Sequence, residues 1–224
     1  MKYLIFDSGP IISLTMSGLL PVLEKLKENF KGEFIMTPQV KQEVVDKPLK
    51  IKKYELEAIQ VNTLLEKGIF KSSSNFFSNQ KLELETNKIL KMANGALRGV
   101  KDKAKINLLQ GGEASCIAFA RLCKCNNVIV IDERTTRLLS ESPRSLHKLM
   151  ERKLHTHLML EESLIREFKD LKFIRSPELL FIAYKKNLIP MKKDKQLLDA
   201  LLYGVKFKGA AISSGEIEEM KSLI

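Results

Sequence analysis

The chain has 224 residues, of which 44% are hydrophobic and 29% are charged. This length and balance are typical of a packed protein with one main core plus an embellishment, and they exclude an intrinsically disordered tail. The 38 Lys and Arg residues exceed the 27 Asp and Glu residues, which gives a formal net charge of +11. Such an excess favours a polyanionic partner such as nucleic acid, although solvated Lys-rich helix faces would produce the same total.

The hydropathy of the chain and its cysteines indicate the cellular compartment in which we expect the protein. No apolar run approaches the roughly 20 residues that span a bilayer, and no signal-peptide h-region is present, so we expect a cytoplasmic protein with no membrane partner. The three cysteines, Cys116, Cys123 and Cys125, are odd in number and closely spaced. They do not describe a secreted disulfide framework, so we expect reduced thiols, with Cys116 packed inside a helix and no metal bound.

The first predicted element is a strand over residues 3–6. This short apolar run lacks polar alternation, as expected of a strand buried on both faces of a parallel sheet. It ends at Asp7, after which Ser8 is a cap candidate and Pro10 suits a first helical turn. Pro21 then interrupts the apolar pattern, which predicts two consecutive helices.

A second junction between strand and helix follows. Residues 33–36, Glu-Phe-Ile-Met, are the predicted strand, after which Thr37 can cap a helix and Pro38 can occupy its first turn. Glu43 lies on that predicted helix. The longer stretch 50–109 is rich in Leu, Glu, Lys and Ile.

The apolar recurrence in that stretch is close to 3.6 residues. It predicts helices over 50–67 and 81–97, separated by a Ser/Asn-rich loop over 71–79.

The third junction begins at Gly111 and Gly112, which open a helix carrying Glu113 in its first turn. The helix leads into residues 127–131, a β-branched run that is the strongest predicted strand and ends at Asp132.

Beyond Asp132 the predicted elements are a helical segment over 140–169 with a break at Pro143, a strand over 172–174, and helices over 176–189, 195–203 and 215–223. We divide the chain into an α/β domain over 1–189, which includes the helical segments near 50–109 and 140–169, and a C-terminal helical extension over 190–224.

This arrangement predicts that four carboxylates come together at one edge of the sheet. Alternating strands and helices predict parallel strands with right-handed crossovers, whose ligands bind beyond the carboxyl ends of the strands. Asp7 and Asp132 end the two strongest strands, and Glu43 and Glu113 can join them from early helical turns. Clustered carboxylates raise one another's pKa, and a basic protein retains them most readily to hold a cation. Oxygen ligands select Mg²⁺ or Mn²⁺, which would activate water against a phosphodiester.

Each acid also has a simpler interpretation. Asp7 could merely cap the following helix, but the same placement at Asp132 makes two coincidences, which favours function. Glu113 could be an ordinary first-turn acid that interacts with the helix dipole, and the preceding glycines favour a site. Glu43 could lie on a solvated helix face, and Asp46 is near enough to replace it as a ligand.

Other polar residues near these motifs are possible accessory residues of the site. Glu133 could extend the site or face solvent, and Arg134 could touch phosphate or form a local ion pair. His155 and His157 are two positions apart and would face different directions on a helix, so we interpret them as surface residues.

Four segments together resemble the PIN-domain family, and they occur in the family's order: LIFDSGPIISL at 4–14, TPQVKQE at 37–43, GGEA at 111–114 and IDER at 131–134. The resemblance covers most of residues 1–139, and 172–189 resembles the final strand and helix of one subgroup. The segments 50–109 and 140–169 depart from the family pattern.

The resemblance implies a parallel sheet flanked by helices, an acidic Mg²⁺ or Mn²⁺ site and ribonuclease activity, as in the toxins of toxin–antitoxin pairs. It makes Asp7, Glu43, Glu113 and Asp132 the catalytic and metal-binding acids, with Ser8 as a polar helper. The expected partners are RNA, an antitoxin or other protein, and a second copy in a homodimer.

Two functions from different classes remain. The first is a metal-dependent endoribonuclease that cleaves RNA phosphodiester bonds, either toxin-like or RNA-processing. The second is a catalytically weak nucleic-acid-binding or assembly module that retains the fold. A phosphatase of the haloacid dehalogenase type also begins with a strand ending in Asp, but it needs a second Asp two positions later, where this chain has Gly9.

Overall fold

Five parallel strands form the central sheet of the computed structural model, which describes residues 2–101 and 105–224. The strand order across the sheet is β3-β2-β1-β5-β7. The strands are β1 (Tyr3–Phe6), β2 (Glu33–Met36), β3 (Phe70–Ser72), β5 (Asn127–Val130) and β7 (Phe173–Ile174). The predicted α/β class with a parallel sheet flanked by helices is confirmed.

The three middle strands are level with one another. Tyr3 of β1 is paired with both Glu33 and Asn127, and Phe6 is paired with both Met36 and Val130. The residues that follow these strands therefore leave the sheet at one edge. The predicted neighbourhood of Asp7 and Asp132 depends on this register.

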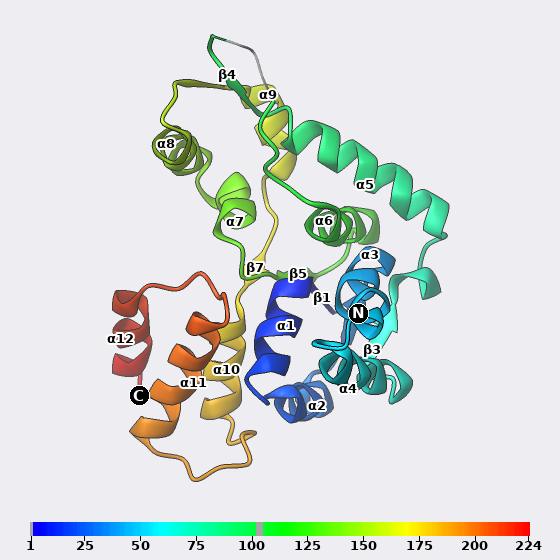
Figure 1. Cartoon of the computed structure of the whole chain (residues 1–224), viewed down its shortest axis with the longest axis vertical. Coiled ribbons are helices and arrows are strands. Elements are labelled where there is room, and N and C mark those ends of the chain that lie inside the picture. Colours follow the sequence, from blue (N-terminus) through cyan, green and yellow to red (C-terminus); the bar gives the residue numbers. More distant parts are fainter. Residues whose placement is uncertain (1, 102–104) are drawn as a thin grey trace.

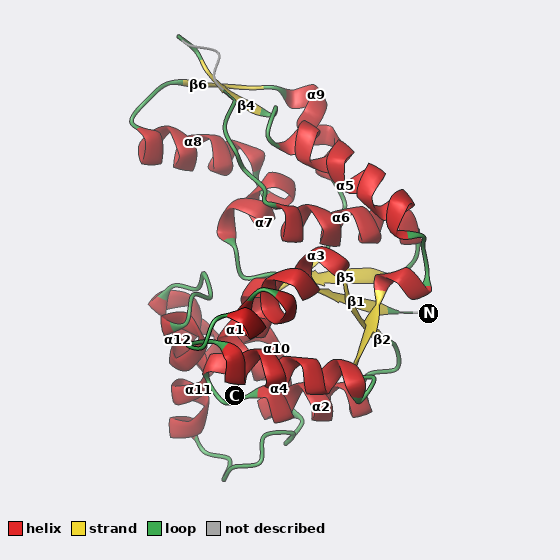
Figure 2. Cartoon of the chain, turned by 45° about the vertical axis from the view of Figure 1, so that its right-hand side comes forward, coloured by secondary structure: helices red, strands yellow, loops and turns green. Residues whose placement is uncertain are grey.

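Helices cover both faces of the sheet (Figures 1 and 2). On one face α6 (Gly111–Cys123) contacts β1 and β5, and α5 (Asn79–Ala93) packs on α6. The other face carries α1 (Ser8–Met16), α2 (Leu20–Asn29), α4 (Glu55–Glu66) and α10 (Ser176–Lys185). Burial from both sides explains why the central strands are apolar without alternation.

Strand β3 corrects the predicted loop over 71–79. Phe70 pairs with Phe34 of β2, so β3 is an edge strand of the main sheet, and a short 3-10 turn (Ser73–Asn75) follows it. The strand has only three residues and runs into serines, so it carries too little pattern to be recognised by periodicity. A second 3-10 turn, Pro48–Lys50, precedes α4.

The two segments that depart from the family pattern meet each other in space. Strand β4 (Leu97–Gly99) from the first pairs antiparallel with β6 (Leu158–Leu160) from the second. The all-helical prediction for both segments is wrong at these strands, because each is short and its partner lies far away in sequence. Residues 102–104 of the first segment and Met1 of the predicted domain lie outside the described residues.

Around this small sheet lie α7 (Arg134–Glu141), α8 (Pro143–Leu154), α9 (Glu162–Ile165) and a 3-10 turn (Arg166–Phe168), all at the end of the molecule that carries α5 in Figure 1. The predicted break before Pro143 is confirmed, because Ser142 separates α7 from α8.

The C-terminal helices α11 (Lys195–Phe207) and α12 (Ser214–Ser222) lie where helices were predicted. Helix α11 packs on α10. The loop between α11 and α12 also reaches the sheet edge, because Ala211 N donates a hydrogen bond to Asp132 O at 3.3 Å. The extension is thus attached directly to the end of β5. Among the described residues, no helix combines the length and apolar character that crossing a membrane requires.

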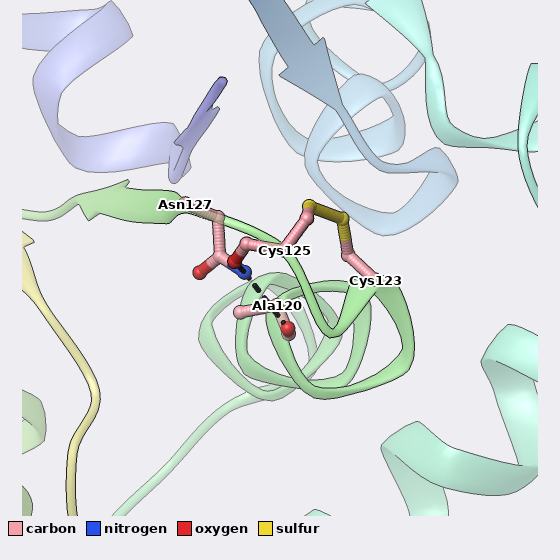
Figure 3. The surroundings of a disulfide bond; sticks show 4 residues. All are labelled: Ala120, Cys123, Cys125 and Asn127. Atoms are coloured by element: carbon pink, nitrogen blue, oxygen red, sulfur yellow. Dashed lines mark hydrogen bonds between the residues drawn. A yellow bond between two sulfur atoms is a disulfide. The ribbon is translucent and has the colours of Figure 1, made fainter. Parts of the chain in front are cut away.

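The prediction of three reduced thiols is wrong for one pair. Cys123 and Cys125 form a disulfide at the end of α6 (Figure 3). Lys124 adopts a left-handed conformation there and turns the chain back, so that the two α-carbons lie 5.3 Å apart. Asn127 holds the turn by donating to Ala120 O and Cys125 O, each at 2.9 Å. Cys116 is free and buried in α6, as predicted.

Candidate active site

Asp7 leaves β1 and caps α1. Its Oδ2 accepts a hydrogen bond from Gly9 N at 3.4 Å, whereas its buried Oδ1 has no partner within the described structure. The side chain is 4% exposed. Burial, followed by the negative charge of Glu113 and then of Glu43, raises the pKa of Asp7 to about 7. Asp7 is therefore both a helix cap and a buried acid that forms no ion pair within the described residues.

Glu43 reaches the same place from the next strand. Thr37 caps α3 (Pro38–Lys41) through its hydroxyl, and the helix continues as a π-helical turn, Gln42–Asp46. Such turns are rare and often occur at functional sites. The Glu43 carboxylate lies against Gly112, since a Cβ added there would meet Oε2 at 2.8 Å.

Asp46, the alternative ligand, lies elsewhere. It forms an ion pair with Lys41 at 2.8 Å and lines a hollow that also includes Ser72 of β3. The structure thus brings Glu43, not Asp46, toward the other acids.

Glu113 is held by two donors near the start of α6. Gln110 N donates to its Oε2 at 2.7 Å, and the Thr136 hydroxyl donates to its Oε1 at 2.8 Å. Burial raises the pKa of Glu113, and the charges of Glu133 and Glu43 act in the same direction. Glu113 is thus a first-turn acid that accepts from the backbone of Gln110, and this role coexists with a position in the acidic cluster. Nothing in the local pattern pointed to Thr136, because its partner lies 23 positions away.

Asp132 is the most fully bonded of the four. Its Oδ1 accepts from Ser176 N at 2.8 Å, and its Oδ2 accepts from the hydroxyls of Ser176 at 2.7 Å and Ser13 at 3.1 Å. Burial raises its pKa even though these hydrogen bonds lower it. Asp132 therefore joins the end of β5 to α1 and to the N-terminus of α10, a role that sequence reasoning missed.

Two of the acids, Asp7 and Asp132, lie close to Gly9 in the first turn of α1. A Cβ on Gly9 would lie 3.7 Å from Asp7 Oδ2 and 3.8 Å from Asp132 Cβ, so Gly9 separates these two side chains. The charges of Glu113 and Glu43 raise the pKa of Asp7, and the charge of Glu43 also raises the pKa of Glu113. In the described part of the chain none of the four acids forms an ion pair, although the whole chain carries a net charge of +11.

The four acids do not form a complete metal centre in the described structure. Among residues 2–101 and 105–224, no three His, Cys, Asp or Glu side chains are close enough to hold an ion as they stand. The donor chemistry nevertheless fits a hard cation: the cluster is oxygen-only, and Asp7 Oδ1 is buried without a partner.

The accessory candidates have mixed positions. Ser8 acts through its backbone, whose hydrogen bond lowers the pKa of Asp7. Glu133 caps α7 by accepting from Thr135 N at 3.2 Å. Arg134 is exposed on the same helix.

Two other expectations concern His157 and Cys116. His157 is a surface residue, as predicted, with its side chain 95% exposed. Cys116 donates to Phe6 O at 3.5 Å, and burial raises its thiol pKa, so it is a packing residue and not a nucleophile.

No protein-family model, curated protein or solved structure matches the chain. The chemistry of the site is therefore inferred from its own residues. Carboxylates that lack cationic partners can hold a divalent ion, and their position beyond the carboxyl ends of parallel strands is where ligands bind in this class of fold.

Proposed function

We propose that the chain is a Mg²⁺- or Mn²⁺-dependent endoribonuclease acting at Asp7, Glu43, Glu113 and Asp132. The observation that carries the proposal is Asp7 Oδ1, a buried carboxylate oxygen without a hydrogen-bond partner in the described structure, beside two further acids. Buried anionic groups are costly unless they are paired or bind a metal. A cation would relieve this cost and serve catalysis.

The side chains divide into ion-holding and orienting groups. Asp7, Glu43 and Glu113 would hold the ion, and Asp132 would contribute from beyond Gly9. The ion would supply an activated water and stabilise charge on the phosphodiester. Thr136 and the Gln110 N–H fix the direction of Glu113, while Ser13 and Ser176 fix Asp132. This support limits the reorganisation needed at the moment of reaction.

The choice of RNA as substrate and of a cytoplasmic, toxin-like or RNA-processing role follows from the resemblance to PIN domains. The net positive charge supports a polyanionic substrate.

A protein partner or a second copy is supported by an apolar groove of about 490 Å³ between α1 and α4, which Glu43 also lines. Its side chains Ile12, Met16 and Tyr54 are 41%, 46% and 39% exposed.

The alternative, a catalytically weak binding or assembly module, also has an observation in its favour. Three donors already occupy the oxygens of Asp132, and the described acids do not yet meet as a metal centre. In such a protein the acids would serve mainly to cap helices.

Cleavage of a fluorescent single-stranded RNA with Mn²⁺, Mg²⁺ or EDTA separates the two functions. We expect wild type to cut with Mn²⁺ or Mg²⁺ only, and Asp7→Asn to be slower by about 100-fold. Asp46→Asn is the matched control, because Asp46 lies close in sequence but is paired with Lys41. A wild-type protein that neither binds Mn²⁺ in calorimetry nor cleaves RNA would leave the binding module as the function.

A further inference from the structure

A second hollow lies beside the carboxylates, at the start of α12, and we call it the α12 hollow. Its volume is about 490 Å³. It is lined by Arg134, Arg137, Leu138, Ala211, Ile212, Ser213 and Glu216. Ala211 N is bonded to Asp132 O, so the hollow adjoins the end of β5. Helix α7 links the two places as well, since it carries both Arg137 and the Thr136 that holds Glu113.

The two arginines of this hollow have unused donors. Arg137 is only 14% exposed, and its Nε is buried without an acceptor in the described structure. Its ion pair with Glu141 is long, at 3.5 Å. Arg134 is exposed, with no acceptor among the described residues. Residues three apart on a helix face the same side, so these guanidinium groups can act on one ligand.

Glu216, the acid that lines the hollow, already accepts hydrogen bonds from other groups. Glu216 accepts from Arg175 Nη1 at 2.7 Å and from Ser213 N at 2.8 Å. These contacts hold the pKa of Glu216 at about 2 despite partial burial. Burial, and then the positive charge of Arg175, lowers the pKa of Arg137. Positive charge therefore lines the hollow from α7, where Arg134 and Arg137 lie. The charges of Glu141, Glu178 and Glu216 act on the pKa of Arg137 in the opposite direction.

The backbone of α12 adds to this field. The helix is nine residues long and is capped by Ser213, whose hydroxyl accepts from Glu216 N at 3.1 Å. The N-terminus of a helix carries partial positive charge that favours anions. Lys206 also reaches this end, donating to the Ser214 hydroxyl at 2.6 Å.

We propose that the α12 hollow binds a phosphate group of the RNA strand next to the bond cut at the carboxylate site, with Arg137 and Arg134 as its ligands. This inference rests on the proposed function. A single guanidinium group can bind phosphate through two parallel N–H donors, and both Arg137 and Arg134 line the hollow with such a group. The phosphate is either an internal diester or a terminal monoester, and both present the same anionic oxygens.

The test uses full-length Asp7→Asn protein in EDTA, so that RNA binding is measured without metal-dependent cleavage. Fluorescence anisotropy measures the Kd for a 3′-labelled single-stranded RNA with a 5′-phosphate or a 5′-hydroxyl, at several KCl concentrations. Calorimetry with inorganic phosphate provides a second probe. The added substitutions are Arg137→Gln, Arg134→Gln and the charge-preserving Arg137→Lys, and the matched control is Lys192→Gln on an exposed loop.

We expect Arg137→Gln and Arg134→Gln each to weaken RNA binding about tenfold and to lower the salt dependence by about one phosphate contact. Arg137→Lys should retain the salt dependence but still bind more weakly, and Lys192→Gln should change Kd less than twofold. A loss confined to 5′-phosphorylated RNA identifies the terminal monoester as ligand, and an equal loss for both RNAs identifies the diester. Arg134 is exposed, so its variant remains informative if Arg137→Gln unfolds.

The outcomes separate the two proposals. Unchanged Kd and salt dependence in both glutamine variants, with wild-type protein cleaving RNA, would overturn the phosphate site and leave the nuclease standing. Arg137-dependent binding of inorganic phosphate by a protein that binds no metal and cuts no RNA would support the phosphate site and reject the nuclease.

Discussion

The carboxylate of Glu43 rests against the α-carbon of Gly112, so that a Cβ at position 112 would lie 2.8 Å from Oε2 and 2.9 Å from Oε1. The neighbouring Gly111 has open space around its own Cβ position. Of the two glycines that open α6, one therefore permits the approach of an acid from the turn after α3. The contact gives the Gly-Gly pair a physical role at the site.

Gly112→Ala should displace Glu43 from the acidic cluster. Because the obstructing atoms belong to the end of a flexible side chain, the fold should survive. We expect Mn²⁺ affinity in calorimetry to fall about tenfold, as for other changes that misplace a ligand. Gly111→Ala is the matched control and should leave the affinity within twofold. Equal affinities for the two variants would show that Glu43 does not contribute to ion binding.

Asp7→Asn should stabilise the metal-free protein at neutral pH. The folded-state pKa of Asp7 is raised from 3.8 to about 7, so the folded protein binds the proton more tightly than the unfolded chain does. Wild-type stability should therefore fall as pH rises from about 4 to 7 and level off above that, by about 4 kcal/mol for this group. The Asn variant lacks this loss.

Urea denaturation in EDTA at pH 5, 6, 7 and 8 measures the difference. The advantage of Asp7→Asn over wild type should grow with pH up to about 7. A constant gap between Asp7→Asn and wild type across this range would mean that Asp7 titrates normally in the fold.

Asp132→Ala should destabilise the fold, unlike Asp7→Asn. It removes the acceptor of both the N–H and the hydroxyl of Ser176, in a site where Asp132 is 3% exposed. The Ser13 hydroxyl also loses Asp132 but keeps Pro10 O as an acceptor at 3.2 Å. Unsatisfied buried donors cost about 1–3 kcal/mol each before relaxation, so we expect a loss of about 2–4 kcal/mol. The urea midpoint reports it. If the free energy of unfolding falls by less than about 0.5 kcal/mol, Asp132 has no structural role of this kind.

The disulfide between Cys123 and Cys125 can be tested by counting the free thiols of the protein. Thiol titration in denaturant without reductant should find one free thiol, that of Cys116, and reduction beforehand should raise the number to three. Cys123→Ser should cost only about 1.5 kcal/mol, because the bridge closes a very short loop. Three thiols in freshly prepared, unreduced protein would restore the expectation of reduced cysteines.

Most of the main sheet could be predicted from local pattern. The bounds expected for β1 and β2 agree with the structure, because a strand buried on both faces is an uninterrupted apolar run ended by a cap and a proline. Strands β3, β4 and β6 have three residues each and are defined by partners distant in sequence, so periodicity does not reveal them.

The candidate site was predictable in part for the same reason. Asp7 and Asp132 could be placed because each follows a recognisable strand. Glu43 was preferred to Asp46 chiefly through the resemblance to PIN domains. The π-helical turn and the contact with Gly112, which support that preference, have no local signature.

The amino-acid sequence by itself determined the places of strands β1, β2, β5 and β7 along the chain, the edge at which the acids emerge and the excess of positive charge. Only the tertiary structure decided how each acid is held. Thr136 fixes Glu113, Ser13 and Ser176 bond Asp132, and one oxygen of Asp7 is left without a described partner. Local pattern reports burial and turn chemistry, whereas hydrogen-bond partners brought together across 23 to 119 positions are set by packing.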